Sequence, residues 1–550
     1  MGIYLNPDND AFRNFVNTGR YVDKTLLIEK LNLLLNDPGR DFVCVSRPRR
    51  FGKSLAEDMI SAYYSKGADS KELFAHFKIS KKKSFETYLN KFNVIKIDLY
   101  AMFSDWQAHF SEEASTKNSF SESFEASEKK EQEPFILSIS RLICSEFREQ
   151  FSDIEFPKSG SLASFIQQVY AQKKETFIII IDEYDVMVRA QVPDEEFDLY
   201  LAFLNSLFKN TTLRPAISLA YITGILPVVR EKIQSKLNTF REYTMVQPED
   251  LAEFIGFTTP EVKKLCKKHK RSFDDCKSWY NGYNLKGFEL YNPQAIYNVM
   301  ISGEFRSYWS ATSSYEVISD RIKMNFDGTK DAVIRMLGGG RVPVNTLKYR
   351  NYMTTFYNKD DVFTYLIHLG YLAYDEDEKE CYIPNREIFL EWQSAIEDNA
   401  DYAETNKIIT ASRELLEETI AGNEKAVAEA LDKSHIHVTS NMSYNNEKSL
   451  QSAIYLAYLY AINHYLITKE MPAGKGYADI VYVPLRKDKP ALIIELKRNS
   501  CPETALNQIR EKQYFDSLEN WQGEILFVGV SYDAETKVHQ CKIERFMKAQ

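Results

Sequence analysis

Hydrophobic residues follow two different patterns along the chain, and the order of these patterns predicts its architecture. Short runs of apolar residues occur at 41–46 (DFVCVS), 176–182 (TFIIIID) and 216–224 (AISLAYITG). Between them, apolar residues recur every three or four positions, as in SLAEDMISAYYS at 54–65. Buried strands that alternate with helices are typical of a parallel α/β sheet. We therefore expect such a sheet within residues 1–250.

The pattern changes twice after this first part. From about Asp250 it is mostly helical, and the last hundred residues return to mixed strands and helices. We expect a helical lid and middle region over 251–430 and a separate α/β domain over 431–550. Within the first part, the segment 104–133 is rich in Ser, Glu and Lys and has few apolar anchors, which predicts an exposed, mobile insertion.

Composition narrows the class of protein. A chain of 550 residues is too long for one core, and 44% hydrophobic with 27% charged residues is ordinary for folded globular proteins. The apolar stretch 454–467 is too short to span a bilayer, and the N-terminus lacks a secretory signal. We therefore expect no membrane contact and a cytoplasmic location, with the seven cysteines, which form no C-x-x-C pair, as reduced thiols.

Charge does not identify a partner by itself. With a net charge of -9, any nucleic-acid binding must come from local basic patches. The clearest are KISKKKS at 78–84 and EVKKLCKKHKRS at 261–272, for which solvated faces are the alternative interpretation. His435 and His437 could share a strand face, and without a third ligand nearby we interpret them as structural.

The segment SRPRRFGKS, residues 46–54, nearly matches the phosphate-binding pattern G-x-x-x-x-G-K-[ST]. Gly52, Lys53 and Ser54 fit, whereas Arg47 replaces the first glycine. In such a loop the lysine reaches the outer phosphates and the hydroxyl binds Mg²⁺. The segment lies between a predicted strand and a predicted helix, which is the context that a phosphate loop requires.

An acidic strand end follows downstream. The run IIIIDE delivers Asp182 and Glu183 at the carboxyl end of a buried strand, where parallel α/β sheets bind their ligands. Asp182 could hold Mg²⁺ through a water molecule, and Glu183 could polarise the attacking water. The loop and the acidic pair together predict a site for Mg²⁺ and a nucleoside triphosphate, which the family resemblance below identifies as ATP.

The segments RPRRFGKSL, IIIIDEYD, ITGILP and WYNGY together resemble the AAA-ATPase-like family of bacterial and archaeal proteins. The resemblance implies a P-loop NTPase sheet in which Arg47 belongs to the family's own loop pattern. Arg47, Arg49 and Arg50 could contact phosphate oxygens, and pairing with acids or with another domain is the alternative for each. Thr223 occupies the place of a residue that senses the γ-phosphate in related ATPases, unless it is only a strand-terminal threonine.

A second group of charged residues lies near the C-terminus. DIVYVP and ALIIELK are strand-like runs separated by RKDKP, which predicts an antiparallel hairpin. With the turn centred near Asp488, Asp479 would lie opposite Lys497. Glu495 and Lys497 share one face of their strand. Two close carboxylates attract Mg²⁺, and a neighbouring lysine can orient or activate water.

This group resembles the metal-binding core of the PD-(D/E)XK nuclease superfamily, in which Asp479, Glu495 and Lys497 match the motif and Ala478 replaces the usual proline. The resemblance implies a restriction-endonuclease-like α/β domain. It also places Glu447 as the first acidic residue, which can share the metal, with a solvated glutamate near a helix start as the alternative. On a downstream amphipathic helix, Gln508 and Lys512 could face the site, and Gln508 followed by Tyr514 fits the superfamily; Lys512 alone is better explained as a solvated residue.

The two resemblances imply a nucleotide-binding ATPase joined to a Mg²⁺-dependent nuclease that cleaves DNA phosphodiester bonds under nucleotide control. DNA is favoured over RNA as the partner, and a homo-oligomer could supply an arginine finger. The main alternative is an NTP-driven switch or scaffold whose nuclease-like domain binds nucleic acid or protein without cleavage. A third interpretation is an ATPase that acts on protein partners.

Overall fold

The structure is a computed structural model, and packing divides it into two compact units. The first comprises 1–270, 283–302 and 345–376, and the second 271–282, 303–344 and 377–550. The predicted three-domain division remains a prediction. The structure describes residues 2–117, 133–227, 239–309, 315–349, 355–397, 399, 402–438, 447–473, 476–484, 489–514, 518, 521 and 523–547.

A five-stranded parallel sheet forms the centre of the first unit, as the apolar runs predicted. Its strands follow the order β2-β3-β4-β1-β5, and each pair is parallel. The order places the carboxyl ends of β1, β3 and β4 side by side, so the residues that follow these strands meet at one edge. The strands are β1 (Phe42–Ser46), β2 (Asn93–Asp98), β3 (Phe177–Asp182), β4 (Ile217–Gly224) and β5 (Arg241–Tyr243).

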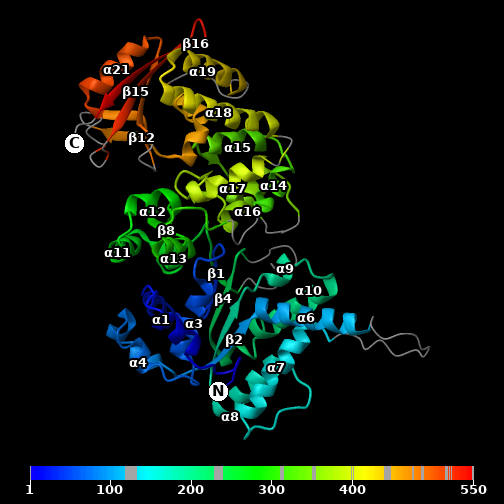
Figure 1. Cartoon of the computed structure of the whole chain (residues 1–550). Coiled ribbons are helices and arrows are strands. Elements are labelled where there is room, and N and C mark those ends of the chain that lie inside the picture. The colour runs from blue at the N-terminus through cyan, green and yellow to red at the C-terminus, as the bar shows by residue number, and fades with distance from the viewer. Residues whose placement is uncertain are drawn as a thin grey trace. The chain divides into compact units, whose positions relative to one another are not determined.

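Helices cover both faces of this sheet (Figure 1). On one face, α7 (Phe135–Gln150), α8 (Leu162–Lys173) and α10 (Asp194–Phe208) share a hydrophobic core with alternate residues of β2 and β3, among them Ile97 and Ile179. On the other face, α3 (Lys53–Tyr64) contacts β2, β3 and β4. Because both faces are covered, all six residues of β3 are buried, which explains its continuous apolar sequence.

A short helix, α2 (Leu26–Asn32), precedes β1. The first unit departs from the sequence expectations in one place. The expected insertion at 104–133 begins inside a helix, α6 (Leu99–Lys117), where the ring of Trp106 packs against Phe103 and Phe135. These aromatic contacts anchor the first part of α6 to α7, which composition alone does not predict. Residues 118–132 lie outside the described residues.

Shorter elements complete the first unit. A small antiparallel sheet has the order β6-β8-β7, with β6 (Phe257–Thr258), β8 (Phe288–Tyr291) and β7 (Tyr283–Leu285). The remaining α-helices and the last short strand are α1 (Asp10–Asn17), α4 (Lys71–Phe74), α5 (Phe85–Tyr88), α9 (Val186–Arg189), α11 (Thr259–His269), α13 (Pro293–Ser302), α16 (Lys359–Leu369) and β10 (Ala373–Asp375).

The second unit contains a mixed five-stranded sheet in the order β12-β13-β14-β15-β16. Only β14 and β15 pair in parallel; the other described pairs are antiparallel, as expected for the β13–β14 hairpin. The strands are β12 (Tyr465–Ala473), β13 (Gly476–Pro484), β14 (Ala491–Arg498), β15 (Glu524–Asp533) and β16 (Val538–Met547).

Helices lie on both sides of this sheet (Figure 1), and alternate residues of its strands pack against them. Ile480 and Ile494 pack with α18 (Ala403–Ala421), α19 (Glu424–Val438) and α20 (Glu447–Ala457). Val481 and Ile493 pack with α21 (Pro502–Glu511) on the opposite face. The central strands β14 and β15 are thus buried on both faces, whereas buried and exposed residues alternate in most of β16.

The other elements of the second unit are mostly helical, in line with the middle-region prediction. They are α12 (Phe273–Tyr280), α14 (Glu316–Ile322), α15 (Thr329–Leu337), α17 (Arg386–Glu397) and an antiparallel pair of β9 (Val342–Pro343) and β11 (Glu380–Tyr382). Trp279 and Tyr280 of the WYNGY segment are buried and belong to the core. His435 and His437 lie in the helix α19 and not on a strand, because the apolar residues Val427 and Leu431 extend the helical face.

Two further expectations concern the whole chain. Six of the seven cysteines are buried, Cys501 is exposed, and all seven are free thiols. Among the described helices, none has the length and hydropathy needed to cross a bilayer.

Candidate functional sites

The loop between β1 and α3 has the backbone of a phosphate-binding turn. Arg50 and Gly52 both adopt left-handed conformations, with φ of 66° and 93°. A Cβ atom on Gly52 would meet no atom within 4 Å, so the backbone conformation, not space, requires glycine here. The twelve-residue helix α3 starts at Lys53 and turns its first N–H groups towards the loop.

Lys53 folds back over this loop. Its side chain is buried, and Nζ donates hydrogen bonds to the carbonyl oxygens of Arg47 (3.1 Å) and Pro48 (3.2 Å). The ammonium group of Lys53 therefore binds carbonyl oxygens of the loop, and the oxygens of a bound anion could take their place. Ser54, Arg49 and Arg50 are exposed beside it.

Arg47 differs from the other two arginines, and here the expectation of a phosphate contact needs correction. The side chain is 0% exposed, and Nη1 donates to the carbonyl oxygens of Ser46 and Tyr243, each at 2.9 Å. Among the residues that the structure describes, none forms a hydrogen bond with its Nε or Nη2. Burial lowers the pKa of Arg47 to about 10. A fully buried guanidinium does not face the loop's exposed side, and Arg47 instead anchors β1 to β5.

Asp182, Thr223 and Glu57 form a buried chain of hydrogen bonds at the carboxyl end of the sheet. The Thr223 hydroxyl lies 2.6 Å from both Asp182 Oδ1 and Glu57 Oε1. A hydroxyl has one proton and cannot donate to both carboxylates, so one of them must be protonated and donate to Thr223. Burial, followed by the charge of Asp182, raises the pKa of Glu57 well above its ordinary value, which places the proton on Glu57.

Sequence reasoning missed Glu57 and also Asp98. Glu57 lies one turn after Lys53 on α3, and this spacing could have indicated that both face the sheet. Asp98 ends β2 level with Asp182, and although its side chain reaches solvent, partial desolvation raises its pKa. The run NVIKID repeats the pattern of an apolar strand that ends in an acid, which was the available signal for Asp98.

Glu183 follows Asp182 in a left-handed conformation, with φ of 54°. Its carboxylate forms an ion pair with Arg189, whose Nε also lies 3.2 Å from Asp185 Oδ1. Burial raises the pKa of Glu183, and the charges of Lys53 and Arg189 oppose this shift. The structure thus brings Lys53, Asp182, Glu183 and Thr223 to one edge of the sheet.

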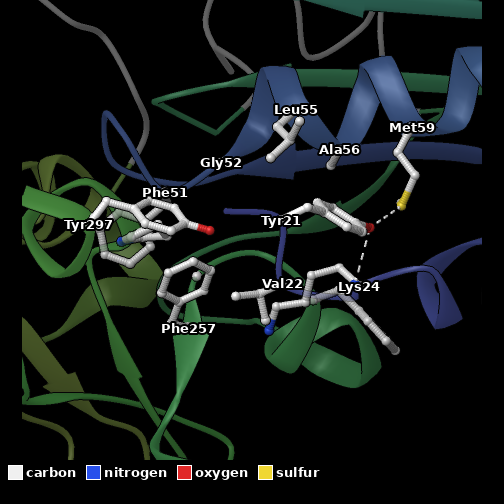
Figure 2. A pocket seen from close by; sticks show the side chains of 13 residues that line it. Tyr21, Val22, Lys24, Phe51, Gly52, Leu55, Ala56, Met59, Phe257 and Tyr297 are labelled. Atoms are coloured by element: carbon white, nitrogen blue, oxygen red, sulfur yellow. Dashed lines mark hydrogen bonds between the residues drawn. The ribbon is translucent and has the colours of Figure 1, made fainter. Parts of the chain in front are cut away.

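An apolar pocket opens beside the phosphate loop (Figure 2). The Tyr21 hydroxyl donates to Met59 Sδ at 3.0 Å and accepts from the Lys24 backbone N–H at 3.2 Å. Four separate segments supply the walls, so no local sequence pattern reveals the pocket. It is lined by Tyr21, Val22, Lys24, Phe51, Gly52, Leu55, Ala56, Met59, Phe254, Gly256, Phe257, Pro293 and Tyr297.

One of the two basic sequence clusters forms a helical face. In α11, Val262 and Cys266 are buried, and Lys263, Lys264 and Lys267 are exposed. In the cluster at 78–84, Lys82 forms a salt bridge of 2.8 Å with Glu29. Of the two, α11 therefore presents the more coherent cationic surface.

In the second unit, the hairpin register brings the two predicted carboxylates together. Ile480 pairs with Ile494, so Asp479 lies level with Glu495 and not, as expected, with Lys497. The centre of the hairpin is one residue earlier than predicted. Asp479 Oδ2 accepts from the Leu496 backbone N–H at 2.8 Å, and the Asp479 N–H lies 3.4 Å from Glu495 Oε2.

Lys497 and Gln508 complete this cluster. Lys497 Nζ donates to Glu495 Oε1 at 3.2 Å, and Gln508 on α21 donates to the same oxygen. Gln508 also donates to the Tyr514 hydroxyl at 3.0 Å. Gln508 therefore faces the site, as expected, whereas Lys512 lies at the C-cap of α21.

The electrostatics of Glu495 fit a divalent cation. The residue is 1% exposed, and burial, followed by the charge of Asp479, raises its pKa to about 7. Two carboxylates held this close are better accommodated when a hard cation binds between them. Among the described side chains, no group of three or more acids, histidines and cysteines converges. Glu447, the expected third ligand, begins α20, and its side chain lies outside the described residues.

Two family models match the segments of the chain that contain the two candidate sites. Residues 10–234 match the family model described as Predicted AAA-ATPase, and residues 445–542 match that of the PD-(D/E)XK nuclease superfamily. Two solved structures are distantly similar. They are Cdc6p from Pyrobaculum aerophilum (11% identity, 68% of this chain and 93% of that one, TM-score 0.25) and the Aeropyrum pernix Orc1 protein in complex with DNA (9%, 94% and 100%, TM-score 0.24).

A curated relative is the uncharacterized protein in the vnfD 5′ region of Azotobacter chroococcum mcd 1. It is 24% identical over 310 residues, which cover 54% of this chain and 52% of the relative. The chain thus matches about half the length of this relative. The family matches and the two clusters of charged residues agree in position, and the chain carries an AAA-ATPase-like domain followed by a PD-(D/E)XK nuclease superfamily domain.

Proposed function

We propose that the chain binds ATP with Mg²⁺ in its first unit and cleaves DNA with Mg²⁺ in its second, under control of the bound nucleotide. The observation that carries the proposal is the meeting of Asp479, Glu495 and Lys497 on adjacent strands. A buried carboxylate pair beside an ammonium suits metal-assisted hydrolysis. A cytoplasmic location and a homo-oligomeric state belong to the same proposal.

At the nuclease site, Asp479 and Glu495, with Glu447 as a third ligand, would hold the metal. Mg²⁺, when bound, polarises the phosphoryl oxygen and lowers the pKa of its water. Lys497 would orient this water, because its Nζ already lies 3.2 Å from Glu495. Gln508 would keep the Glu495 carboxylate in place through its hydrogen bond.

At the nucleotide site, Lys53 would exchange the carbonyl oxygens of Arg47 and Pro48 for phosphate oxygens. Ser54 and Asp182 would hold Mg²⁺, which neutralises phosphate charge when bound. Glu183 would accept the proton of the attacking water. Thr223 would orient Asp182 through their hydrogen bond of 2.6 Å.

Arg47, Arg49 and Arg50 have different parts in this proposal. The exposed Arg49 and Arg50 would contact phosphate oxygens, whereas Arg47 would hold the loop against β5. Arg47, which replaces the first glycine of the usual pattern, would thus stabilise the loop through its contact with β5.

The pocket beside the loop would hold the base of the nucleotide. Phe51 and Gly52 belong both to the loop and to the pocket wall, so a nucleotide with its phosphates at Lys53 has this pocket within reach. Tyr21, Phe257 and Tyr297 supply aromatic surface against which a base can pack (Figure 2).

The nuclease proposal is tested by incubating the full chain with plasmid, linear and single-stranded DNA and with RNA, with or without Mg²⁺ and ATP. We expect Mg²⁺-dependent cleavage of DNA, its loss in Asp479→Asn and Lys497→Met, and its retention in Lys537→Met, which removes an exposed lysine of the same unit. Circular dichroism checks the folding of each variant. Cleavage that persists in Asp479→Asn would refute this site.

The nucleotide proposal is tested by titrating the chain with a fluorescent ATP analogue. We expect binding in the wild type and its loss in Lys53→Ala. Ala56→Phe, which narrows the pocket but leaves the loop intact, should weaken ATP binding and leave inorganic triphosphate binding unchanged. Equal competition by triphosphate and ATP in the wild type would show that the pocket does not hold the base.

Two observations favour a second candidate function. Glu183 is already engaged by Arg189, and Lys53 by the loop carbonyls, so the site suits nucleotide binding better than rapid turnover. The chain would then act as a nucleotide-dependent switch or scaffold whose nuclease-like domain binds nucleic acid or protein. Binding of DNA without cleavage in the nuclease assay would select this function.

A further inference from the structure

We propose that Arg189 is a positioning residue that holds Glu183 in a resting orientation and thereby restrains ATP hydrolysis. The inference rests on the proposed nucleotide site, in which Glu183 accepts the proton of the attacking water. Arg189 itself was not singled out by any sequence motif, because it lies six residues beyond Glu183, after the acidic strand end.

The ion pair between the two side chains is largely shielded from water. Arg189 Nη2 contacts Glu183 Oε2, and the side chains are only 16% and 22% exposed. Ionic hydrogen bonds in such surroundings are stronger than those on an open surface. The contact is therefore a real restraint on the Glu183 carboxylate.

Arg189 is the fixed partner of this pair. Its backbone N–H donates to the Asp185 carbonyl oxygen at 3.0 Å, and its Nε lies 3.2 Å from Asp185 Oδ1. Asp185 is fully buried, and its Oδ2 accepts the backbone N–H groups of Ile225 and Leu226, both at 3.0 Å. The end of β4 thus anchors Asp185, and Asp185 anchors Arg189.

Glu183 is the partner that can move. It lies on a tight turn in a left-handed conformation, which side chains other than glycine adopt at a cost, so the surrounding contacts must hold it there. While its oxygen binds the guanidinium, that oxygen is not available to a water molecule. Hydrolysis would require Glu183 to turn from Arg189 towards the phosphate side, where Lys53 lies.

The test compares Arg189→Gln and Arg189→Lys with the wild-type chain. Arg214→Gln serves as the matched control, because Arg214 also forms a partly buried ion pair, with Asp41, but before β1 at the opposite end of the strands. ATP turnover at saturation and the dissociation constant of a fluorescent ATP analogue are measured for each chain. The split between turnover and affinity separates a restraint on Glu183 from a general loss of structure.

We expect Arg189→Gln to raise kcat by about fivefold or more with an unchanged dissociation constant. Arg189→Lys, which keeps the ion pair, should remain close to the wild type, and Arg214→Gln should not raise kcat. Unchanged or slower turnover in Arg189→Gln, with ATP still bound, would overturn the inference. If the wild type and every variant fail to bind ATP, the proposed nucleotide site fails instead, and the two failures are thus distinguishable.

Discussion

The raised pKa of Glu495 makes the stability of the second unit depend on pH in an unusual direction. The folded carboxyl titrates at about 7, against an ordinary value of 4.5. Between these values the folded chain keeps a proton that the unfolded chain has lost. The free energy of unfolding therefore falls as pH rises from 4.5 to 7, by up to about 3 kcal/mol at 1.36 kcal/mol per pKa unit. Below 4.5 the effect is absent.

Glu495→Gln removes this titration and keeps the size of the side chain. Fixed effects of the substitution, such as altered contacts with Lys497 and Gln508, act at all pH values and cancel when two pH values are compared. Between pH 4.5 and pH 8, without divalent cations, the free energy of unfolding of the variant should rise by about 3 kcal/mol relative to that of the wild type. Glu535→Gln, which changes an exposed glutamate of the same unit, should give no such gain.

The measurement must report on the second unit alone. Pulsed hydrogen exchange of a peptide that covers β14, recorded across a urea series at each pH, gives the local free energy of unfolding within the intact chain. Parallel pH dependence of the wild type and Glu495→Gln would refute the reasoning, because it would mean that Glu495 ionises in the folded chain as it does in the unfolded one.

Three further predictions follow from the two sites. At pH 6, Mg²⁺ added to the nucleotide-free chain should release up to one proton more from the wild type than from Glu495→Gln, measured by calorimetry in two buffers; equal release would contradict the metal assignment. Arg47→Ala should lower the unfolding free energy of the first unit by about 3 kcal/mol, whereas Arg49→Ala should change it by less than about 0.5 kcal/mol. Equal melting temperatures of the two variants would contradict an anchoring role for Arg47. Gly224→Ala should cost about 1–3 kcal/mol in a urea titration, because its Cβ would lie 2.6 Å from the ring of Tyr184, and an unchanged midpoint would refute this packing.

The strands that carry both sites could be predicted from the sequence, because burial on two faces leaves a continuous apolar run. FIIIID became β3 and ALIIELK the core of β14 for this reason. The acids that end these runs were found in the same way. Asp98 follows the same rule and was missed only because the Lys96 within its strand interrupts the apolar run.

Side-chain direction and long-range contacts could not be predicted from the sequence. The motif groups Arg47 with Arg49 and Arg50, yet Arg47 faces β5, which the chain reaches almost two hundred residues later. The register of the β13–β14 hairpin was off by one residue at its centre, because RKDKP contains several turn-forming residues. The pairing of Glu183 with Arg189 depends on the anchoring of Asp185 by the end of β4, which is again a tertiary contact.

The burial of the cysteines offers a way to observe the second unit in solution. Cys501 is the one exposed thiol of the seven, so a maleimide dye would attach there without any mutation. It occupies the N-cap of α21, and Gln508 lies seven residues further along the same helix, about 10 Å away at 1.5 Å per residue. A dye at this position would follow metal entry next to Glu495 as a change in fluorescence in the native sequence.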